Sequence, residues 1–466
     1  MAHIADARFT HGSLIRHVSV MSFTTSVGLM AIYAVDLLDI FFISMLGQAP
    51  MAAAAGYASA LMFFASAINI GLSVAAGALV ARALGAGREG RARDYAASAA
   101  VFAGITGIAL PLLTLPILPE LLTLLGATGE PHALARSYLW IILPTTALSG
   151  LSMTAVAVIR SHGDARQAIY PALAGAVVNA AMDPVLIFGM EMGLEGAAWA
   201  TVLARLVIVL WAFYPLIWRF NGLAWPRLPA VLRDARPTTR IAAPAVLATI
   251  AMPIGMAIVT REMARYGTEA VVGMAVINRM IPVVFSVILA LSGAIGPIIG
   301  QNYGAGRLDR VRESFFDGLK FVAIYVVVAA VLLFVLRDPI ADLFNATGAA
   351  RDLIHLFCGP LALAMFFNGV IFVANAVFNN LGHPGYSTWV NLGRYTLGTW
   401  PMVVAGGALL GPEGVLIGQA AGGALFAAFA AWLALRVIDC PAEGVVLPHF
   451  RYRDMRMQQL CHRCNR

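Results

Sequence analysis

Long apolar stretches separated by short polar loops run along almost the whole chain of 466 residues. A helix needs about 20 apolar residues to cross the roughly 30 Å hydrocarbon core of a bilayer. Twelve stretches reach that length: 14–46, 52–81, 95–117, 133–159, 167–189, 195–218, 241–266, 270–299, 314–336, 351–379, 386–409 and 413–436. Such lengths favour helices over the strands of a membrane barrel, which are about ten residues long and alternate in polarity. The pattern predicts an all-α integral membrane protein with twelve transmembrane helices.

A short basic motif occurs twice, once in each half of the chain. Residues 83–94 read ALGAGREGRARD and residues 302–313 read NYGAGRLDRVRE, which gives identities at an offset of 219 residues. The shared positions in the first copy are Gly85, Ala86, Gly87, Arg88, Arg91 and Arg93. The register persists in the pair Gly163 with Gly382, at 219 residues, and to within one residue in the pair Gly193 with Gly411, at 218. We therefore predict an internal duplication.

The duplication also predicts the topology, because an even number of spans between equivalent positions gives both copies the same orientation. We expect two parallel six-helix lobes at 1–218 and 241–438, a basic cytoplasmic linker at 219–240 and a disordered cytoplasmic tail at 439–466. Transporters built from such repeats bind substrate between the lobes and expose it to each side in turn. A duplication with a structural role alone stays open.

Composition agrees with a protein dissolved in a bilayer. Hydrophobic residues make up 60% of the chain and charged residues 12%, against about 25% charged in an ordinary soluble domain. In the tail, Cys461 and Cys464 form a CHRC sequence. A structural zinc site needs four ligands, so we predict no metal site there.

The basic residues indicate how the chain is oriented. Lys320 is the only lysine among 31 basic residues, and the arginines lie in short loops rather than in one patch, which argues against nucleic-acid binding. With the N-terminus in the cytosol, most of them fall in inside segments, while the opposite loops hold only Arg136, Arg337 and Arg351. By the positive-inside rule both termini face the cytosol, as expected of a multi-pass inner-membrane protein.

Among the acidic residues within predicted spans, Asp36 and Asp39 in helix 1 and Asp183 in helix 5 are the candidates for function. Each costs about 2.5–3.5 kcal/mol on insertion scales unless it has a partner, a cavity or a function. Asn179 and Asp183 are four residues apart and share one helix face, where their oxygens suit Na⁺ or a proton with a water molecule. Pro184 removes a backbone donor and can expose a carbonyl to the same site. The alternative is that Asp183 only caps this irregularity.

The remaining candidates have competing interpretations. Asp36 and Asp39 point about 60° apart, so only one of them faces the lobe centre squarely. Glu262 lies beside Arg261 and Arg265, which favours an ion pair. Four methionines could line an adaptable substrate cavity or simply pack: Met252, Met256, Met274 and Met280.

Several motifs carry a family resemblance: LLDIFFISMLG with Asp39, NAAMDP in helix 5, GAAWAT ending in Thr201, and IIGQNYGAGR in the second half. Over residues 14–436 the chain resembles the multidrug and toxic compound extrusion (MATE) family, in its bacterial DinF-like branch with an Asp-Pro in helix 5. The resemblance implies a MATE-like fold and a cation site, possible for Na⁺, in the first lobe. That site would be formed by Asp39, Asn179, Asp183 and Thr201.

The chain departs from the family pattern in two places. Helix 1 has no proline between Ser13 and Gly47, so a mechanism that depends on a proline kink there is in doubt. Helix 10 offers asparagines, Asn368, Asn375 and Asn379, where another branch has an acid. We therefore assign cation coupling to the first lobe.

Together these features predict a secondary active efflux transporter. It would act as an H⁺ or Na⁺ antiporter that exports organic, mainly cationic, drugs or metabolites by alternating access, without a cofactor and as a monomer. The first alternative is a flippase for lipid-linked precursors, which would have a cationic cavity, yet only a few arginines, Arg205, Arg279 and Arg394, lie well inside spans rather than at their ends. A membrane enzyme would need clustered nucleophile, base or metal ligands, and the histidines are scattered.

Overall fold

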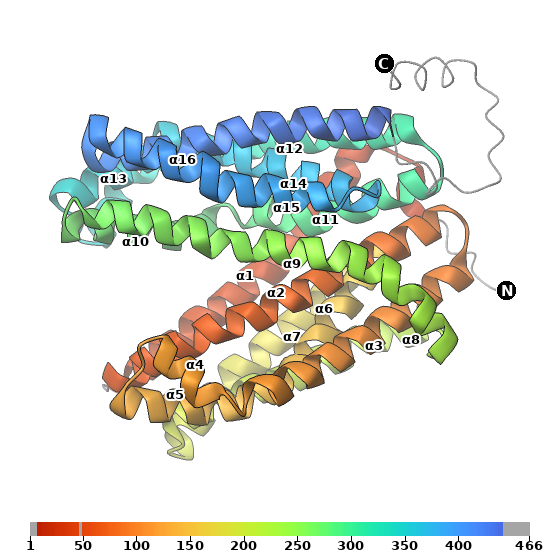
Figure 1. Ribbon diagram of the computed structural model, residues 1–466, viewed down its shortest axis with the longest axis horizontal. Helices are drawn as coiled ribbons and strands as arrows, with labels where there is room; N and C mark the ends of the chain where they lie inside the picture. Colours follow the sequence, from red (N-terminus) through yellow and green to blue (C-terminus); the bar gives the residue numbers. More distant parts are fainter. Residues whose placement is uncertain (1–6, 46–48, 441–466) are drawn as a thin grey trace. The chain divides into compact units, whose positions relative to one another are not determined.

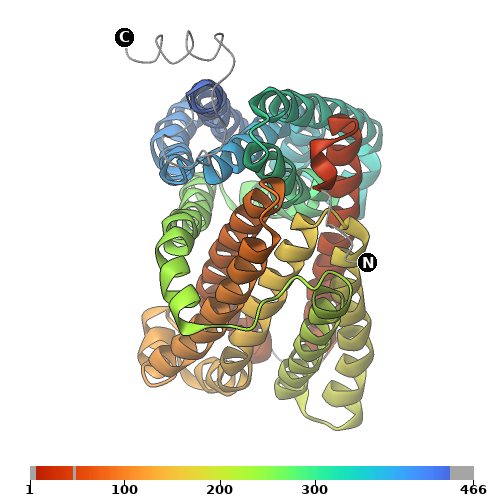
Figure 2. The same ribbon diagram turned by 90° about the vertical axis from the view of Figure 1, so that its right-hand side faces the viewer.

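The computed structural model describes residues 7–45 and 49–440, and every regular element in those ranges is a helix. By contact the described chain divides into two compact units. Unit 1 contains residues 27–84 and 88–246, and unit 2 contains residues 7–26, 85–87 and those from 247 onward. In both views the helices of each unit lie side by side as a bundle (Figure 1 and Figure 2).

The helices from the first half of the chain make up most of unit 1. Their bounds are α1 Leu14–Met45, α2 Ala49–Gly85, α3 Glu89–Thr114, α4 Leu118–Leu124, α5 Gly129–Ile142, η2 Leu143–Thr145, α6 Thr146–Ser161, α7 Ala165–Pro184, the π-helix η3 Val185–Gly189 and α8 Gly193–Trp218. The first part of α1 and the short helix η1, Arg8–Thr10, group with unit 2.

Unit 2 contains most of the remaining elements. They are α9 Leu228–Ala264, α10 Thr268–Val284, α11 Ser286–Gly304, α12 Leu308–Leu343, α13 Gly348–Cys358, η4 Pro360–Ala364, α14 Met365–Asn380, α15 Gly385–Gly393, the π-helix η5 Arg394–Gly398 and α16 Thr399–Asp439. The start of α9, up to Val246, groups with unit 1. The two lobes at 1–218 and 241–438 stay a prediction. They are inferred from the sequence repeat, whereas the two units are defined by contacts between residues, so the units do not test them.

The number of membrane spans follows from helix length and from one backbone break. Within the described residues, ten helices are long and apolar enough to cross a bilayer, and α10 with α11, bent by 48°, counts as one further span. One of the ten, Gly385–Asp439, has 55 residues, about 80 Å at 1.5 Å per residue, far more than one crossing requires. Gly411 breaks it with φ 64° and ψ −145°. Counted as two, it completes the twelve predicted spans.

The two halves of α16 pack through glycine. A Cβ atom at Gly414 would lie 1.9 Å from the carbonyl oxygen of Gly406, and one at Gly418 would lie 2.1 Å from that of Met402. The backbones on either side of Gly411 therefore meet as an antiparallel pair. Small residues allow membrane helices this close approach.

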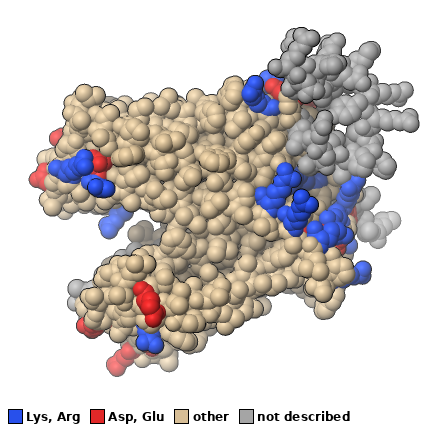
Figure 3. All heavy atoms as spheres, viewed as in Figure 1, with Lys and Arg blue, Asp and Glu red and all other residues tan. Residues whose placement is uncertain are grey.

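The surface of each unit matches a bilayer. In each of them the charged side chains gather toward helix ends, and other residue types cover the length between (Figure 3). Large apolar side chains such as Leu112, Leu210 and Leu397 are exposed there. In water this surface would be unfavourable, whereas lipid tails solvate it.

The first copy of the repeated basic motif holds the start of α9. Arg91 Nη1 lies 2.8 Å from Asp234 Oδ1, and Ser98 Oγ donates to Asp234 Oδ2 at 3.0 Å. Arg233 Nη2 lies 2.9 Å from Asp94 Oδ2. The linker expected at 219–240 is therefore a loop only up to residue 227, and Figure 2 shows this loop crossing the ends of unit 1 helices from α8 to α9.

The second copy holds the segment that precedes α1. Arg310 Nη2 donates to the carbonyl oxygens of Phe9 at 3.2 Å and Gly12 at 3.0 Å. Arg307 donates to the carbonyl of Thr10 at 2.8 Å, and Gln301 Oε1 accepts from the backbone N–H of Phe9 at 2.9 Å. Arg91 and Arg310, which are 219 positions apart, thus each hold the entry to a long helix. The predicted tail lies mainly in 441–466, outside the described residues.

Candidate cation site in unit 1

One face of α7 is buried along its whole length and becomes polar at its end. The buried positions Ala165, Ala168, Pro171, Gly175, Asn179 and Asp183 recur every three or four residues, the period of a helix face. Asp164 caps the helix by accepting from the backbone N–H of Gln167 at 3.1 Å. Asn179 and Asp183 therefore share a face, as the sequence predicts.

Pro184 ends the regular α-helical hydrogen bonding directly after this polar pair. The next residues, Val185–Gly189, form a π-helix, a rare element that is frequent at functional sites. Proline lacks the N–H that would bond the preceding turn. The buried acid thus lies at a local irregularity of the helix.

The amide of Asn179 joins two carboxyl groups from different helices. Oriented so that both contacts are satisfied, its nitrogen donates to Asp183 Oδ2 at 3.2 Å and to Asp39 Oδ1 at 2.8 Å. Asp183 and Asp39 therefore share one amide as their hydrogen-bond donor. Two carboxyl groups that share one donor group repel each other when both are ionised, so a bound proton or cation stabilises the arrangement.

The burial of this cluster leaves one oxygen without a partner. Asn179 is 2% exposed and Asp183 is 0% exposed, while Asp39 is half-buried. In the described part of the chain, Asp183 Oδ1 is buried and has no hydrogen-bond partner. An unsatisfied buried polar group costs about 1–3 kcal/mol, and more if it is charged. A proton or a cation bound at this oxygen would remove that cost, so the residues fit a cation ligand.

Thr201 lies on α8, which packs against α7. Its hydroxyl group donates to the carbonyl of Ala197 in its own helix at 3.0 Å. Its oxygen lone pairs can still accept or ligate. The assignment of Thr201 to the cation site stays a prediction.

The secondary acids have different surroundings. Glu262 of α9 is buried, and its Oε2 lies 2.8 Å from Arg265 Nη1, so the ion pair expected for it is present. Asp36 lies on α1, and its side chain is outside the described part of the structure.

The four candidate methionines do not share one environment. Met252 and Met256 on α9 are exposed, whereas Met274 and Met280 on α10 are buried. The buried pair fits the packing alternative. The exposed pair leaves the cavity interpretation as a prediction.

Two arginines within spans bind neutral acceptors, which the sequence pattern did not indicate. Arg205 Nη1 donates to Thr145 Oγ1 at 2.6 Å and to the carbonyl of Ile142 at 3.3 Å. Arg394 donates to Asn368 Oδ1 and lies over the ring of Tyr395. No spacing rule in the sequence links these partners, because they lie 26 to 63 positions apart.

The described residues contain no group of three or more His, Cys, Asp or Glu side chains that could hold a metal ion. Cys461 and Cys464 of the CHRC sequence lie outside these residues. The acid pair with its asparagine therefore stands as the candidate ligand set.

Comparison with known proteins agrees with the repeat and the fold. The MatE family model matches residues 25–185 and again 244–403, so the second match begins 219 residues (244 minus 25) after the first.

Several of the individual proteins that match are named as transporters or export proteins. The FAD transporter of Shewanella oneidensis is 27% identical over 403 residues, 85% of this chain and 89% of that protein. The multidrug export protein MepA of Staphylococcus aureus is 24% identical over 364 residues, covering 76% and 78% of the two chains. A mutant of the Vibrio cholerae MATE transporter VcmN superposes with a TM-score of 0.84 at 23% identity, over 91% and 96% of the two chains. The chain is a multi-span membrane protein that belongs to the MatE family of transporters.

Proposed function

We propose that this protein is a cation-coupled antiporter that exports organic molecules from the cell. The observation that carries the proposal is the buried cluster of Asp39, Asn179 and Asp183, in which one carboxylate oxygen has no partner. Ionisable groups within membrane spans mark ion and proton pathways in transporters. In the proposal, Asp39 and Asp183 hold the coupling ion, and Asn179 fixes their geometry.

Coupling requires the ion to bind one conformation better than the other. Asp183 is fixed on α7 beside the π-helix, while Asp39 comes from α1. Protonation of the pair allows the two carboxyl groups to approach, and loss of the proton drives them apart by like-charge repulsion. Occupancy of the site would in this way shift α1 relative to α7 and change the affinity for substrate.

We favour H⁺ over Na⁺ as the coupling ion. One proton shared by Asp39 and Asp183 is enough to relieve the repulsion between the two carboxyl groups. A hard metal cation takes several oxygen ligands, and the cluster offers two carboxyl groups and one amide. Thr201 would have to turn its lone pair toward the cluster for Na⁺ to be held.

The substrate class follows from the relatives only in outline. One relative is named an FAD transporter, and FAD is an anionic molecule. Another relative is named a multidrug export protein. We propose organic drugs or metabolites, cationic ones first. The protein would act in the inner membrane, as a monomer without a cofactor and with both termini in the cytosol, since the basic residues gather in the loops on that side.

A flippase for lipid-linked precursors is the second candidate. Arg205 and Arg394 bind neutral acceptors, so their positive charge is not cancelled by those partners. Such residues could bind a phosphate group. The acid cluster in unit 1 has no evident role in that function, which is why it ranks second.

The test is dye and FAD transport in everted vesicles under separately imposed H⁺ and Na⁺ gradients. Wild type should move at least one of these probes under one gradient only, and Asp39→Asn should lose that movement. Asp317→Asn is the matched control, because this buried acid is paired with Lys320 at 3.1 Å. Gradient-driven transport at an unchanged rate in both Asp39→Asn and Asp183→Asn would refute the assignment.

A further inference from the structure

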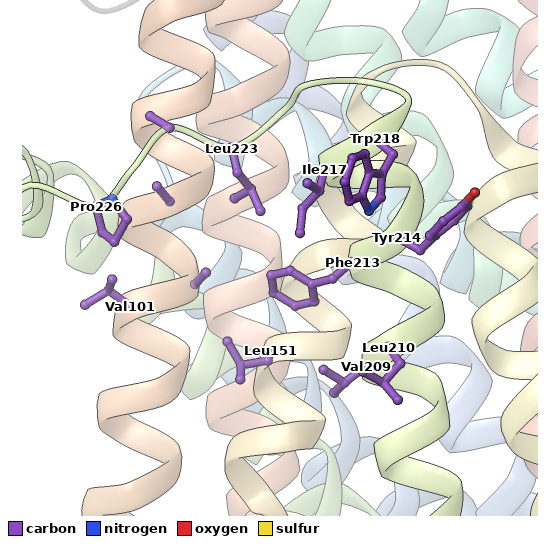
Figure 4. A pocket seen from close by; sticks show the side chains of 13 residues that line it. Val101, Leu151, Val209, Leu210, Phe213, Tyr214, Ile217, Trp218, Leu223 and Pro226 are labelled. Carbon is purple, nitrogen blue, oxygen red and sulfur yellow. The ribbon is translucent and has the colours of Figure 1, made fainter.

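Unit 1 has an apolar cavity that the transport proposal does not use. It has a volume of about 650 Å³, within the range of about 300–1,000 Å³ typical of ligand sites. Its walls come from α3, α6 and α8, and residues 223–226 of the loop before α9 lie over one end (Figure 4).

The cavity is elongated along α8. Leu151 and Val209 lie toward one end, and Trp218 and Leu223 lie toward the other (Figure 4). The ten residues from Val209 to Trp218 extend about 14 Å along a helix axis. This length is close to half of the roughly 30 Å hydrocarbon core, the depth of one leaflet.

The open side of the cavity faces hydrocarbon rather than water. Its α8 wall includes Leu210, Tyr214 and Trp218, all of them well exposed, within the span Gly193–Trp218. Side chains of this kind in a membrane span lie against lipid. An occupant that reaches the Val209 end must therefore be apolar along most of its length.

The shallow end of the cavity, which Trp218 and Pro226 border from opposite edges (Figure 4), is amphipathic and positively charged. Tyr214 and Trp218 stand together at one edge of the cavity (Figure 4), and such residues are enriched at the level of lipid headgroups. Arg219 directly follows Trp218, and Arg227 directly follows the lining residue Pro226. Arg219 lies 3.2 Å from Asp164. Arg227 is exposed and has no acidic partner within the described part of the chain.

We propose that this cavity binds one acyl chain of an anionic phospholipid, with the lipid phosphate at Arg227. The apolar wall matches the acyl chain, and its depth of one leaflet matches the length of that chain. The unpaired arginine at the shallow end matches the phosphate group. A neutral lipid would fill the wall and leave Arg227 without its partner. Clustered basic residues beside a span recognise anionic headgroups. The site is separate from Asp39, Asn179 and Asp183, so it stands or falls independently of the antiport proposal.

The test is native mass spectrometry of the full chain, reconstituted with equal amounts of phosphatidylglycerol and phosphatidylcholine that carry the same acyl chains. Wild type should retain one phospholipid and prefer phosphatidylglycerol by about fivefold, as expected for one arginine near an anionic headgroup. Arg227→Gln should keep the bound lipid and lose the preference. Ala100→Phe should fill the cavity and lose the lipid.

Two further variants keep the result interpretable. Leu210→Asn puts a polar group in an exposed part of the wall, where a folding defect is not expected, and should also lose the lipid. Leu112→Trp is the matched control, since this exposed α3 residue lies outside the cavity, and it should retain the lipid. The proposal is overturned if wild type retains no lipid, if the cavity variants retain as much as the control, or if an export substrate occupies the cavity and phospholipid does not displace it.

Discussion

Asp183 of unit 1 differs from Glu262 and Asp317 of unit 2 in the groups that it faces. In unit 2, Glu262 lies 2.8 Å from Arg265, and Asp317 lies 3.1 Å from Lys320. In unit 1, Asp183 contacts the amide of Asn179, which also contacts the carboxyl group of Asp39. An acid beside a base holds a fixed charge, whereas two neighbouring acids exchange charge with a bound proton or cation. The comparison indicates that the acid pair of unit 1, rather than the acids of unit 2 that lie beside a base, can bind and release a proton or cation.

The two copies of the repeated motif make the same comparison at the helix ends. Arg91 pairs with the buried carboxylate of Asp234, while Arg310 binds the backbone carbonyls of Phe9 and Gly12. Both arginines hold the entry to a long helix. The two copies therefore share this role, although one binds a charged side chain and the other binds neutral backbone.

The largest expected effect is the loss of transport when the carboxyl group of Asp183 in unit 1 is replaced by an amide. Asp183→Asn should lower gradient-driven transport by about tenfold or more, in line with the coupling free energies of linked sites. The vesicle assay measures it, with Asp317→Asn as the control. Equal losses in the two variants would mean that the position of the acid, rather than its partner, decides its role.

The next largest effect concerns the two motif arginines. Arg91→Gln leaves the buried Asp234 with only Arg233 and Ser98, and breaking a buried ion pair costs about 3 kcal/mol. Arg310→Gln removes hydrogen bonds to carbonyl groups and should cost about 1–2 kcal/mol. Thermal unfolding of the purified variants should therefore rank Arg91→Gln below Arg310→Gln.

A second substitution at this motif shows how much of the stability lost in Arg91→Gln comes from the buried charge of Asp234 and how much from lost packing. Adding Asp234→Asn to Arg91→Gln removes the uncompensated charge, so the double variant should be less destabilised than the two single effects predict when added. Strict additivity would show that the ion pair does not stabilise the start of α9.

Glu262→Gln should have a small effect, which sharpens the contrast with Asp183. Arg265 is 59% exposed at its side chain, and pairs with an exposed partner contribute at most about 1 kcal/mol. Transport and thermal stability should remain close to wild type in the assays above. A loss as large as that of Asp183→Asn would place the coupling site in unit 2 as well.

The smallest effect is a pH dependence in the loop after α6. Burial lowers the pKa of His162 from its ordinary 6.5, and the carbonyl of Val158 partly offsets this. The unfolded imidazole then takes up a proton at a higher pH than the folded one, so stability is full above pH 6.5 and falls as the pH drops. His162→Leu gives this position the residue of the second copy, Leu381, and should remove the decline. The check is to measure the unfolding temperatures of wild type and His162→Leu from pH 8 to pH 5. A decline of the same size in both proteins would contradict the prediction.

Part of the candidate site could be predicted from local spacing. Asn179 and Asp183 share a helix face because they are four residues apart, and the fold class follows from the length of the apolar stretches. The meeting of Asn179 with Asp39 could not be predicted in this way, since 140 positions (179 minus 39) separate them. Thr201 entered through family resemblance, and its recorded hydrogen bond lies within its own helix.

The sequence by itself determined the membrane environment, the helices and the duplication, because bilayer thickness and helical periodicity act on neighbouring residues. The tertiary structure decided that the α9 helix begins at Leu228, that η1 docks on the second motif, and that an oxygen of Asp183 is buried without a partner. It also decided the shape of the apolar cavity in unit 1. These features depend on which distant segments pack together, and packing is set by the summed contacts of many residues rather than by any local pattern.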